Sequence, residues 1–82
     1  TAFTQSLAKE LAPRILVNAV APGMLEDTEQ PSYSDEQHRR EIRRIPAGRL
    51  GTCGEVAEAV LFLLKNDYMN GHVLTVDGGR SI

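Results

Sequence analysis

The feature that most constrains the fold of this chain is the stretch ILVNAVAPG, from Ile15 to Gly23. Six of its nine residues are apolar, and one polar residue, Asn18, lies among them. A run that is apolar on both faces is typical of a central strand in a parallel sheet, because helices cover both faces of such a sheet. The pattern predicts a strand over residues 14–20 and a bend at Pro22-Gly23, before a long polar stretch.

A second strand, HVLTV, is predicted over residues 72–76, and the tight turn Asp77-Gly78-Gly79 follows it. In the first dozen residues, Phe3, Leu7 and Leu11 recur at a spacing of four with Ala8 beside them, which predicts one stripe of an amphipathic helix. Helices are predicted over residues 1–12, 34–44 and 55–66.

The clearest local signal is the start of the last helix. Thr52-Cys53-Gly54-Glu55 fits the pattern of a capping box, in which the side chains of Thr52 and Glu55 bind amides at the helix start. The helix that follows, EVAEAVLFLLKN, carries a broad apolar surface. Such a surface predicts burial on two sides.

The order helix, strand, two helices, strand is that of a parallel α/β architecture. With 82 residues, two parallel strands and their helices cannot bury a self-sufficient core. We therefore expect residues 1–82 to form part of a single domain, at the edge of a larger sheet.

Composition narrows the functional classes. The single cysteine, Cys53, excludes an intramolecular disulfide, and no Cys/His spacing resembles a zinc site. A net charge of −2 argues against a general nucleic-acid binder, and no apolar run approaches a membrane span. A cytoplasmic protein that binds neither nucleic acid nor membrane is expected.

Three blocks together resemble the C-terminal portion of a short-chain dehydrogenase/reductase: SLAKELAPRILVNAVAPG, IPAGRLGTCGEVAEAVLFLL and NGHVLTVDGG. They occur in the family's order and cover residues 4–82 almost completely. The resemblance implies the last two strands, with flanking helices, of a Rossmann-type doubly wound parallel sheet. IPAGRLG and VDGG are similar to members that reduce 3-oxoacyl groups on acyl carrier protein, and LAPRILVN is mildly similar to pteridine reductases.

The same resemblance implies a fragment of an NAD(P)(H)-dependent oxidoreductase that interconverts a carbonyl and an alcohol. The family's glycine-rich dinucleotide loop, its catalytic Ser and its Tyr-x-x-x-Lys motif do not occur in the 82 residues, and Tyr33 and Tyr68 lack a Lys four residues later. No catalytic residue is therefore assigned, and this chain alone is expected to be inactive. The alternative is a non-catalytic interaction or oligomerisation module derived from the family.

By position, the resemblance implies cofactor contacts just after the first strand, where ligands of open α/β sheets bind. The expected residues are Pro22, Gly23, Met24, Leu25, Asp27 and Thr28. Gly23 would let the backbone approach the nicotinamide ring, and the backbone of Met24 and Leu25 would bind its carboxamide. Asp27 stands where the family often has Thr, and its charge would repel a pyrophosphate, so either Thr28 replaces it or the contact is lost. The choice between NAD and NADP stays open.

Residues 25–45 correspond by resemblance to the variable lid over the small-molecule substrate. Four arginines lie in this lid or at its end, Arg39, Arg40, Arg43 and Arg44, and interleaved acids favour a solvated face over an anion-binding site. The resemblance further implies a homotetramer or homodimer, with Val60, Leu61 or Leu64 near a two-fold axis. Asn18 is expected to brace neighbouring loops, and Cys53 to be inert.

Overall fold

The computed structural model describes residues 1–28 and 33–82. Its elements follow in the order α1 (Ala2–Leu11), β1 (Ala19–Pro22), α2 (Asp35–Arg43), α3 (Cys53–Lys65) and β2 (Val73–Val76). The two strands pair in parallel, with a register from Ala19 opposite Val73 to Pro22 opposite Val76. The predicted parallel α/β arrangement is confirmed.

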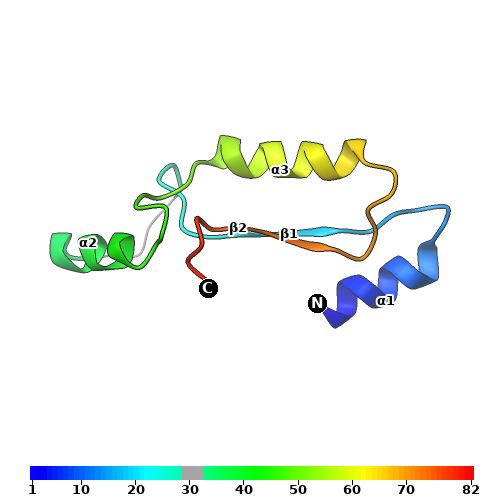
Figure 1. The fold of residues 1–82 in the computed structure, drawn as a ribbon, viewed down its shortest axis with the longest axis horizontal. Coiled ribbons are helices and arrows are strands. Elements are labelled where there is room, and N and C mark those ends of the chain that lie inside the picture. Colours follow the sequence, from blue (N-terminus) through cyan, green and yellow to red (C-terminus); the bar gives the residue numbers. More distant parts are fainter. Residues whose placement is uncertain (29–32) are drawn as a thin grey trace.

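The three helices lie at different positions around the strand pair. In Figure 1, α3 runs along one face of β1 and β2, and α1 lies on the other side near the amino ends of the strands. The remaining helix, α2, lies beyond the carboxyl ends of the strands, away from the other elements.

The helix starts follow from local sequence. Thr52 is the N-cap of α3 and accepts from the amide of Glu55, whose side chain binds back to Thr52. Ser34 and Gln37 form the same reciprocal box at the start of α2. These boxes satisfy amide donors that the first helical turn leaves unpaired. The capping box predicted at Thr52 is confirmed.

The bounds predicted for the first strand are wrong. The strand was expected over residues 14–20, whereas β1 covers Ala19–Pro22. The amide of Val17 donates to Asn70 Oδ1 over 2.9 Å, and the amide of Gly71 donates to Val17 O over 2.7 Å. Val17 is thus bound by the loop before β2, because its partner strand begins only at Val73.

Two asparagines join the segments that enter the strands. Asn18 Nδ2 donates to Met69 O over 3.0 Å, and Asn18 Oδ1 accepts from the amide of His72 over 3.1 Å. Asn70 accepts from Val17 and donates through Nδ2 to Ala8 O over 3.2 Å. The expected bracing role of Asn18 is confirmed, and Asn70 adds a link to α1.

Only part of the predicted stripe of α1 packs against the rest of the chain. Thr4 and Ala8 are buried, Ala8 to 2% exposure, whereas Phe3 of the stripe is 73% exposed. A Cβ atom on Gly71 would lie 3.4 Å from the Cβ of Ala8. The small residue Ala8 lets the helix approach the Asn70-Gly71 turn closely, which the larger members of the stripe could not.

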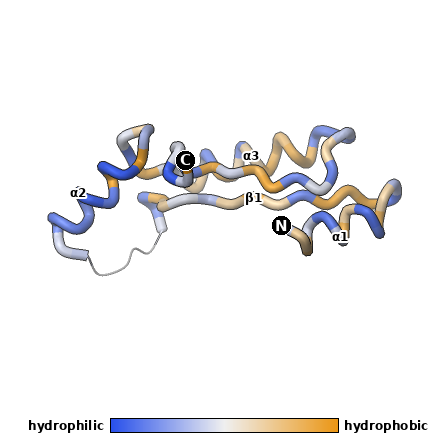
Figure 2. The backbone as a smooth tube through the Cα atoms, turned by 60° about the horizontal axis from the view of Figure 1, so that its bottom comes forward, coloured by the Kyte–Doolittle hydropathy of each residue, from blue (hydrophilic) through white to orange (hydrophobic). Residues whose placement is uncertain are grey.

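The apolar surface of α3 is covered on one side only. Val56, Ala59 and Leu63 are half-buried and recur at helical spacing. Leu61, Phe62 and Leu64 are exposed, to 51%, 53% and 73%. In Figure 2, hydrophobic stretches follow α3, whereas α2, at the far end of the molecule, is mostly hydrophilic. Within residues 1–28 and 33–82, only one side of α3 is covered, so its burial on two sides stays a prediction.

In the described part of the chain, the helices are too short and too polar to span a bilayer.

Candidate functional site

The candidate site lies at the carboxyl ends of β1 and β2. Pro22 is the last residue of β1, and not part of a bend after the strand as predicted. The amides of Ala19 and Gly23 both donate toward β2, to His72 O and Val76 O. Backbone donors alternate sides along a strand, so Pro22, which has no N–H, has its nitrogen directed away from β2.

Gly23 lies directly against the start of the turn after β2. A Cβ atom on Gly23 would be 2.8 Å from the Cβ and 2.9 Å from the Cα of Asp77. The φ angle of Gly23 is not positive, unlike those of Gly78 and Gly79. The need for glycine at position 23 therefore comes from the proximity of Asp77 and not from an unusual backbone angle.

Asp77 closes the turn after β2. Its Oδ1 accepts from the amide of Gly79 over 2.9 Å, and its Oδ2 accepts from the amide of Ser81 over 3.0 Å. Hydrogen bonds from Ser81, and then from Gly79, hold the pKa of Asp77 below its usual value. The amide of Ala47 donates to Gly78 O, which ties this turn to the connector between α2 and α3.

The segment after Gly23 pairs with the residues that precede α3. The amide of Gly51 donates to Met24 O over 3.1 Å, and the amide of Glu26 donates to Gly51 O over 2.8 Å. These two bonds form an isolated parallel bridge between Leu25 and Gly51. The hydroxyl of Thr28 donates to Leu25 O over 3.1 Å, which closes a short turn. The expected cofactor residues thus form one ordered strip.

Asp27 binds the start of α3. The amide of Cys53 donates to Asp27 Oδ1 over 2.9 Å and to Oδ2 over 3.2 Å. This hydrogen bond holds the pKa of Asp27 below its usual value. The same pair raises the pKa of the Cys53 thiol, first through the hydrogen bond with Asp27, which agrees with the expectation that this cysteine is inert.

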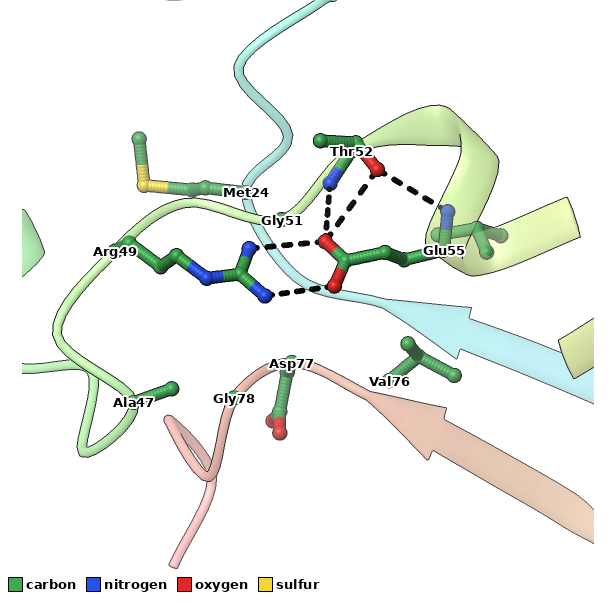
Figure 3. A pocket seen from close by; sticks show the side chains of 10 residues that line it. Met24, Ala47, Arg49, Gly51, Thr52, Glu55, Val76, Asp77 and Gly78 are labelled. Atoms are coloured by element: carbon green, nitrogen blue, oxygen red, sulfur yellow. Dashed lines mark hydrogen bonds and ion pairs between the residues drawn. The ribbon is translucent and has the colours of Figure 1, made fainter. Parts of the chain in front are cut away.

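An ion pair that the sequence interpretation missed lies beside this strip. Arg49 Nη1 and Nη2 donate to Glu55 Oε1 and Oε2 over 2.9 and 2.7 Å, while Glu55 also accepts from the amide of Thr52 (Figure 3). Hydrogen bonds from Arg49, and then from Thr52, lower the pKa of Glu55 to about 2. In the sequence, the one sign of this ion pair is that Arg49 lies six residues before Glu55, the glutamate of the capping box.

The cavity beside this ion pair is small. Its volume is about 90 Å³, and Met24, Val56, Val76 and Gly78 are among the residues that line it. Ligand pockets for small organic molecules usually measure roughly 300–1,000 Å³. The cavity is therefore too small for a dinucleotide, and the strip 22–28 presents an open edge and not an enclosed pocket.

The remaining candidates have local roles in the described part of the chain. Arg40 and Arg44 pair with Glu36 and Glu41 over 3.9 and 3.3 Å, as expected for a solvated face. Residues 1–28 and 33–82 contain no cluster of three or more metal-ligating side chains. The expected lid, residues 25–45, includes residues 29–32, which lie outside the described residues.

Comparison with known proteins shows what this chain is similar to. The family model described as enoyl-(acyl carrier protein) reductase matches residues 1–81. The 3-oxoacyl-[acyl-carrier-protein] reductase of Rattus norvegicus is 50% identical over 81 residues, 98% of this chain and 33% of that protein. The reductase of that name from Aquifex aeolicus is 50% identical over 80 residues, 94% of this chain and 32% of its own length.

Solved structures agree with the sequence matches. A short chain dehydrogenase from Bacillus anthracis superposes with a TM-score of 0.87 at 39% identity, over 99% of this chain and 33% of that one. A small-chain dehydrogenase in complex with NADPH superposes with a TM-score of 0.81 at 40% identity, over 96% of this chain and 37% of that one. The chain spans about a third of the length of these relatives.

Proposed function

The chain belongs to the short-chain dehydrogenase/reductase family, through the family model described as enoyl-(acyl carrier protein) reductase, and we propose that it supplies the nicotinamide end of the cofactor site of an NAD(P)(H)-dependent oxidoreductase. The observation that carries this proposal is the ordered strip 22–28 at the carboxyl end of a parallel strand, in a chain matched to reductases over residues 1–81. Open α/β sheets bind their ligands at such ends.

The charges of the strip fit a neutral carboxamide. The carboxylate of Asp27 is engaged by the amide of Cys53. The pKa of Arg49 is raised first by Glu55 and also by the charge of Glu26, so the negative charge of Glu26 lies close to a cation. Asp27 and Glu26 thus interact with groups of the protein, with Cys53 and Arg49. We propose that the backbone of Met24 and Leu25 binds the carboxamide.

The proposed contacts are those of Pro22, Gly23, Met24, Leu25, Asp27 and Thr28, with different roles. Gly23 holds the strip against Asp77, and Asp27 acts through Cys53 and not on the cofactor. Thr28 binds back to Leu25 O and so shapes the turn beside the carboxamide site. When bound, the nicotinamide supplies or accepts the hydride, and the residues of this chain orient the ring.

The substrate class that we propose is a 3-oxoacyl thioester, reduced to the 3-hydroxy form. The support is that curated relatives from Rattus norvegicus and Aquifex aeolicus carry the name 3-oxoacyl-[acyl-carrier-protein] reductase. NADPH is the proposed cofactor because a neighbouring structure was solved with it. Residues 25–45 are proposed as the lid over the substrate, in a cytoplasmic enzyme.

We also propose that the whole protein is a homotetramer or homodimer. Leu61, Phe62 and Leu64 form an exposed apolar surface on α3. Surfaces of this kind mark interaction sites more often than isolated exposed residues do. In the alternative arrangement, the rest of the reductase domain covers this surface of α3. Sedimentation of the assembled protein distinguishes this arrangement from an oligomer interface.

The test is a chimera in which residues 1–82 replace the matching third of the Aquifex aeolicus reductase. Oxidation of NADPH and NADH is followed by absorbance, with a 3-oxoacyl thioester as substrate. We expect substrate-dependent oxidation of NADPH. A chimera that folds by circular dichroism but shows no turnover with either cofactor would favour the alternative, a non-catalytic interaction module.

A further inference from the structure

The inference concerns Asp27 and its bond to the start of α3. The capping box satisfies the amides of Thr52 and Glu55 through each other's side chains. The amide of Cys53, the first residue of α3, is left out of this exchange. Its acceptor is Asp27, which lies 26 positions earlier in the chain. A local motif at the helix start is thus completed by a residue of the candidate cofactor strip.

The bond to Cys53 is the last of three links between the strip and the segment before α3. The first two are the backbone bonds between Gly51 and the strip, at Met24 O and at the amide of Glu26. They hold the strip at Met24 and at Glu26, the residues on either side of Leu25. Asp27 adds the only side-chain link of the three, to a helix that packs on both strands. It extends the attachment of the strip to residues 51–53 beyond Glu26, by one residue.

Both oxygens of Asp27 accept from the amide of Cys53, at 2.9 and 3.2 Å, and the thiol of Cys53 also bonds to this carboxylate. Bonds from amides to carboxylates are shorter and stronger than bonds between neutral groups, and the partial positive charge of a helix start adds to them. The neighbouring acid Glu26 carries the same charge and is exposed like Asp27, but the bonds from the amide of Cys53 go to Asp27. Asp27 and Glu26 therefore differ in their contact with α3 and not in charge.

We propose that Asp27 is a positioning residue, which fixes the backbone of Met24 and Leu25 for the nicotinamide end of the cofactor by anchoring the strip to the start of α3. This proposal rests on the proposed function, because it assumes that the strip meets the cofactor. It assigns Asp27 no contact with the cofactor and no part in proton transfer.

The experiment measures KM for NADPH and kcat in the chimera for four variants. Asp27→Ala removes the acceptor, and Asp27→Asn keeps an oxygen acceptor but loses the charge. Glu26→Gln removes a charge from the next position without touching Cys53. Thr52→Ala weakens the same helix start through its local cap and leaves the link to the strip in place.

We expect Asp27→Ala to raise KM for NADPH roughly tenfold, the effect of losing one hydrogen bond to a charged group. Its kcat should stay within about threefold, and KM for the thioester should not change, because only cofactor placement is altered. Asp27→Asn should lie between Asp27→Ala and the parent chimera. Glu26→Gln and Thr52→Ala should leave KM for NADPH within about twofold.

Two results would overturn the proposal. The first is an unchanged KM for NADPH in Asp27→Ala. The second is an equal rise in Thr52→Ala, which would assign the effect to fraying of α3. Both presuppose an active parent chimera, so they are distinct from failure of the proposed function, in which the parent chimera itself shows no turnover. If Asp27→Ala does not fold, the comparison of Asp27→Asn with Glu26→Gln decides the question.

Discussion

A Cβ atom placed on Gly23 would lie 2.8 Å from the Cβ of Asp77, which is closer than folded proteins tolerate. The contact joins the residue after β1 to the residue after β2, at the edge where the cofactor is proposed to bind. It also gives Gly23 a structural reason to be glycine that is independent of any ligand. Substitutions of Gly23 are therefore expected to affect the stability of the fold, whether or not a ligand is bound.

We predict that Gly23→Ala destabilises the chimera by about 1–3 kcal/mol, the usual cost of inserting an atom into a packed site. The added methyl group must push Asp77, and with it the turn that Asp77 closes through Gly79 and Ser81. The measurement is the free energy of unfolding in urea. Gly23→Val should cost more, because it adds two further atoms.

A matched glycine lies nearby. Gly54 is inside α3, and a Cβ atom there would have only Thr52 Oγ1 near it, at 3.7 Å. Gly54→Ala should therefore stabilise the protein by up to about 1 kcal/mol, through the higher helix propensity of alanine. Equal stability of Gly23→Ala and the parent chimera would show that Asp77 yields without cost.

A second prediction concerns the brace between the strand entrances. Asn70→Ala removes an acceptor from Val17 and a donor to Ala8 O at once. We expect a loss of about 1–3 kcal/mol in the free energy of unfolding, since the amide of Val17 loses its acceptor and Ala8 O keeps only the amide of Ala12. Asn66→Ala is the control, because Asn66 Oδ1 accepts only a local bond, from the amide of Tyr68. A smaller loss in Asn70→Ala than in Asn66→Ala would contradict the bracing role.

A third prediction is the pH dependence of the ion pair between Arg49 and Glu55. The pKa of Glu55 is lowered from 4.5 to about 2, so its ionised form is favoured in the folded protein. The stability that it contributes is fully present above pH 4.5 and is lost as the pH falls through that value toward 2. We expect the difference in Tm between the parent chimera and Glu55→Gln to shrink across this window.

Asp27 and Asp77 also have lowered pKa values, and they remain in both proteins of the comparison, so the difference isolates Glu55. Glu58→Gln is the control, because Glu58 is an exposed acid of the same helix. A Tm difference for Glu55→Gln that stays constant from pH 6 to pH 3 would be incompatible with the ion pair as described.

A fourth prediction concerns the 82-residue chain by itself. Within the described residues, the buried hydrophobic side chains are Ala8, Ile45 and Leu50. So few buried groups cannot offset the conformational entropy of ordering the chain. We expect the isolated chain to unfold without a cooperative transition in calorimetry and to oxidise no NADPH. A sharp heat-absorption peak, or turnover, would contradict this expectation.

A fifth prediction tests assembly. Leu61→Glu puts a charge on the exposed apolar surface of α3. If that surface lies at a two-fold interface, two carboxylates are buried together, which costs several kcal/mol. We expect sedimentation to show a smaller assembly with an unchanged circular dichroism spectrum. An intact assembly in Leu61→Glu, with the fold preserved, would refute this interface.

Local sequence alone determined most of the secondary structure. The capping boxes at Thr52 and Ser34 identify the starts of α3 and α2, because their partners lie three residues away on the same turn. The apolar runs identify the two strands, and their separation by helices requires that they pair in parallel. Contacts between residues this close in the sequence can be predicted without knowledge of the rest of the fold.

Only the tertiary structure decided which residues meet. Asp27 and Cys53 are 26 positions apart, and Gly23 and Asp77 are farther, so no local pattern indicates that a carboxylate completes a distant helix start or that a glycine clears a distant Cβ atom. The packed part of α1 was likewise decided by the approach of Ala8 to Gly71, which buries Ala8 of the apolar stripe and leaves Phe3 exposed. The periodicity of the sequence shows which residues of a helix can be buried. The shape of the segment that packs against the helix determines which of them are buried.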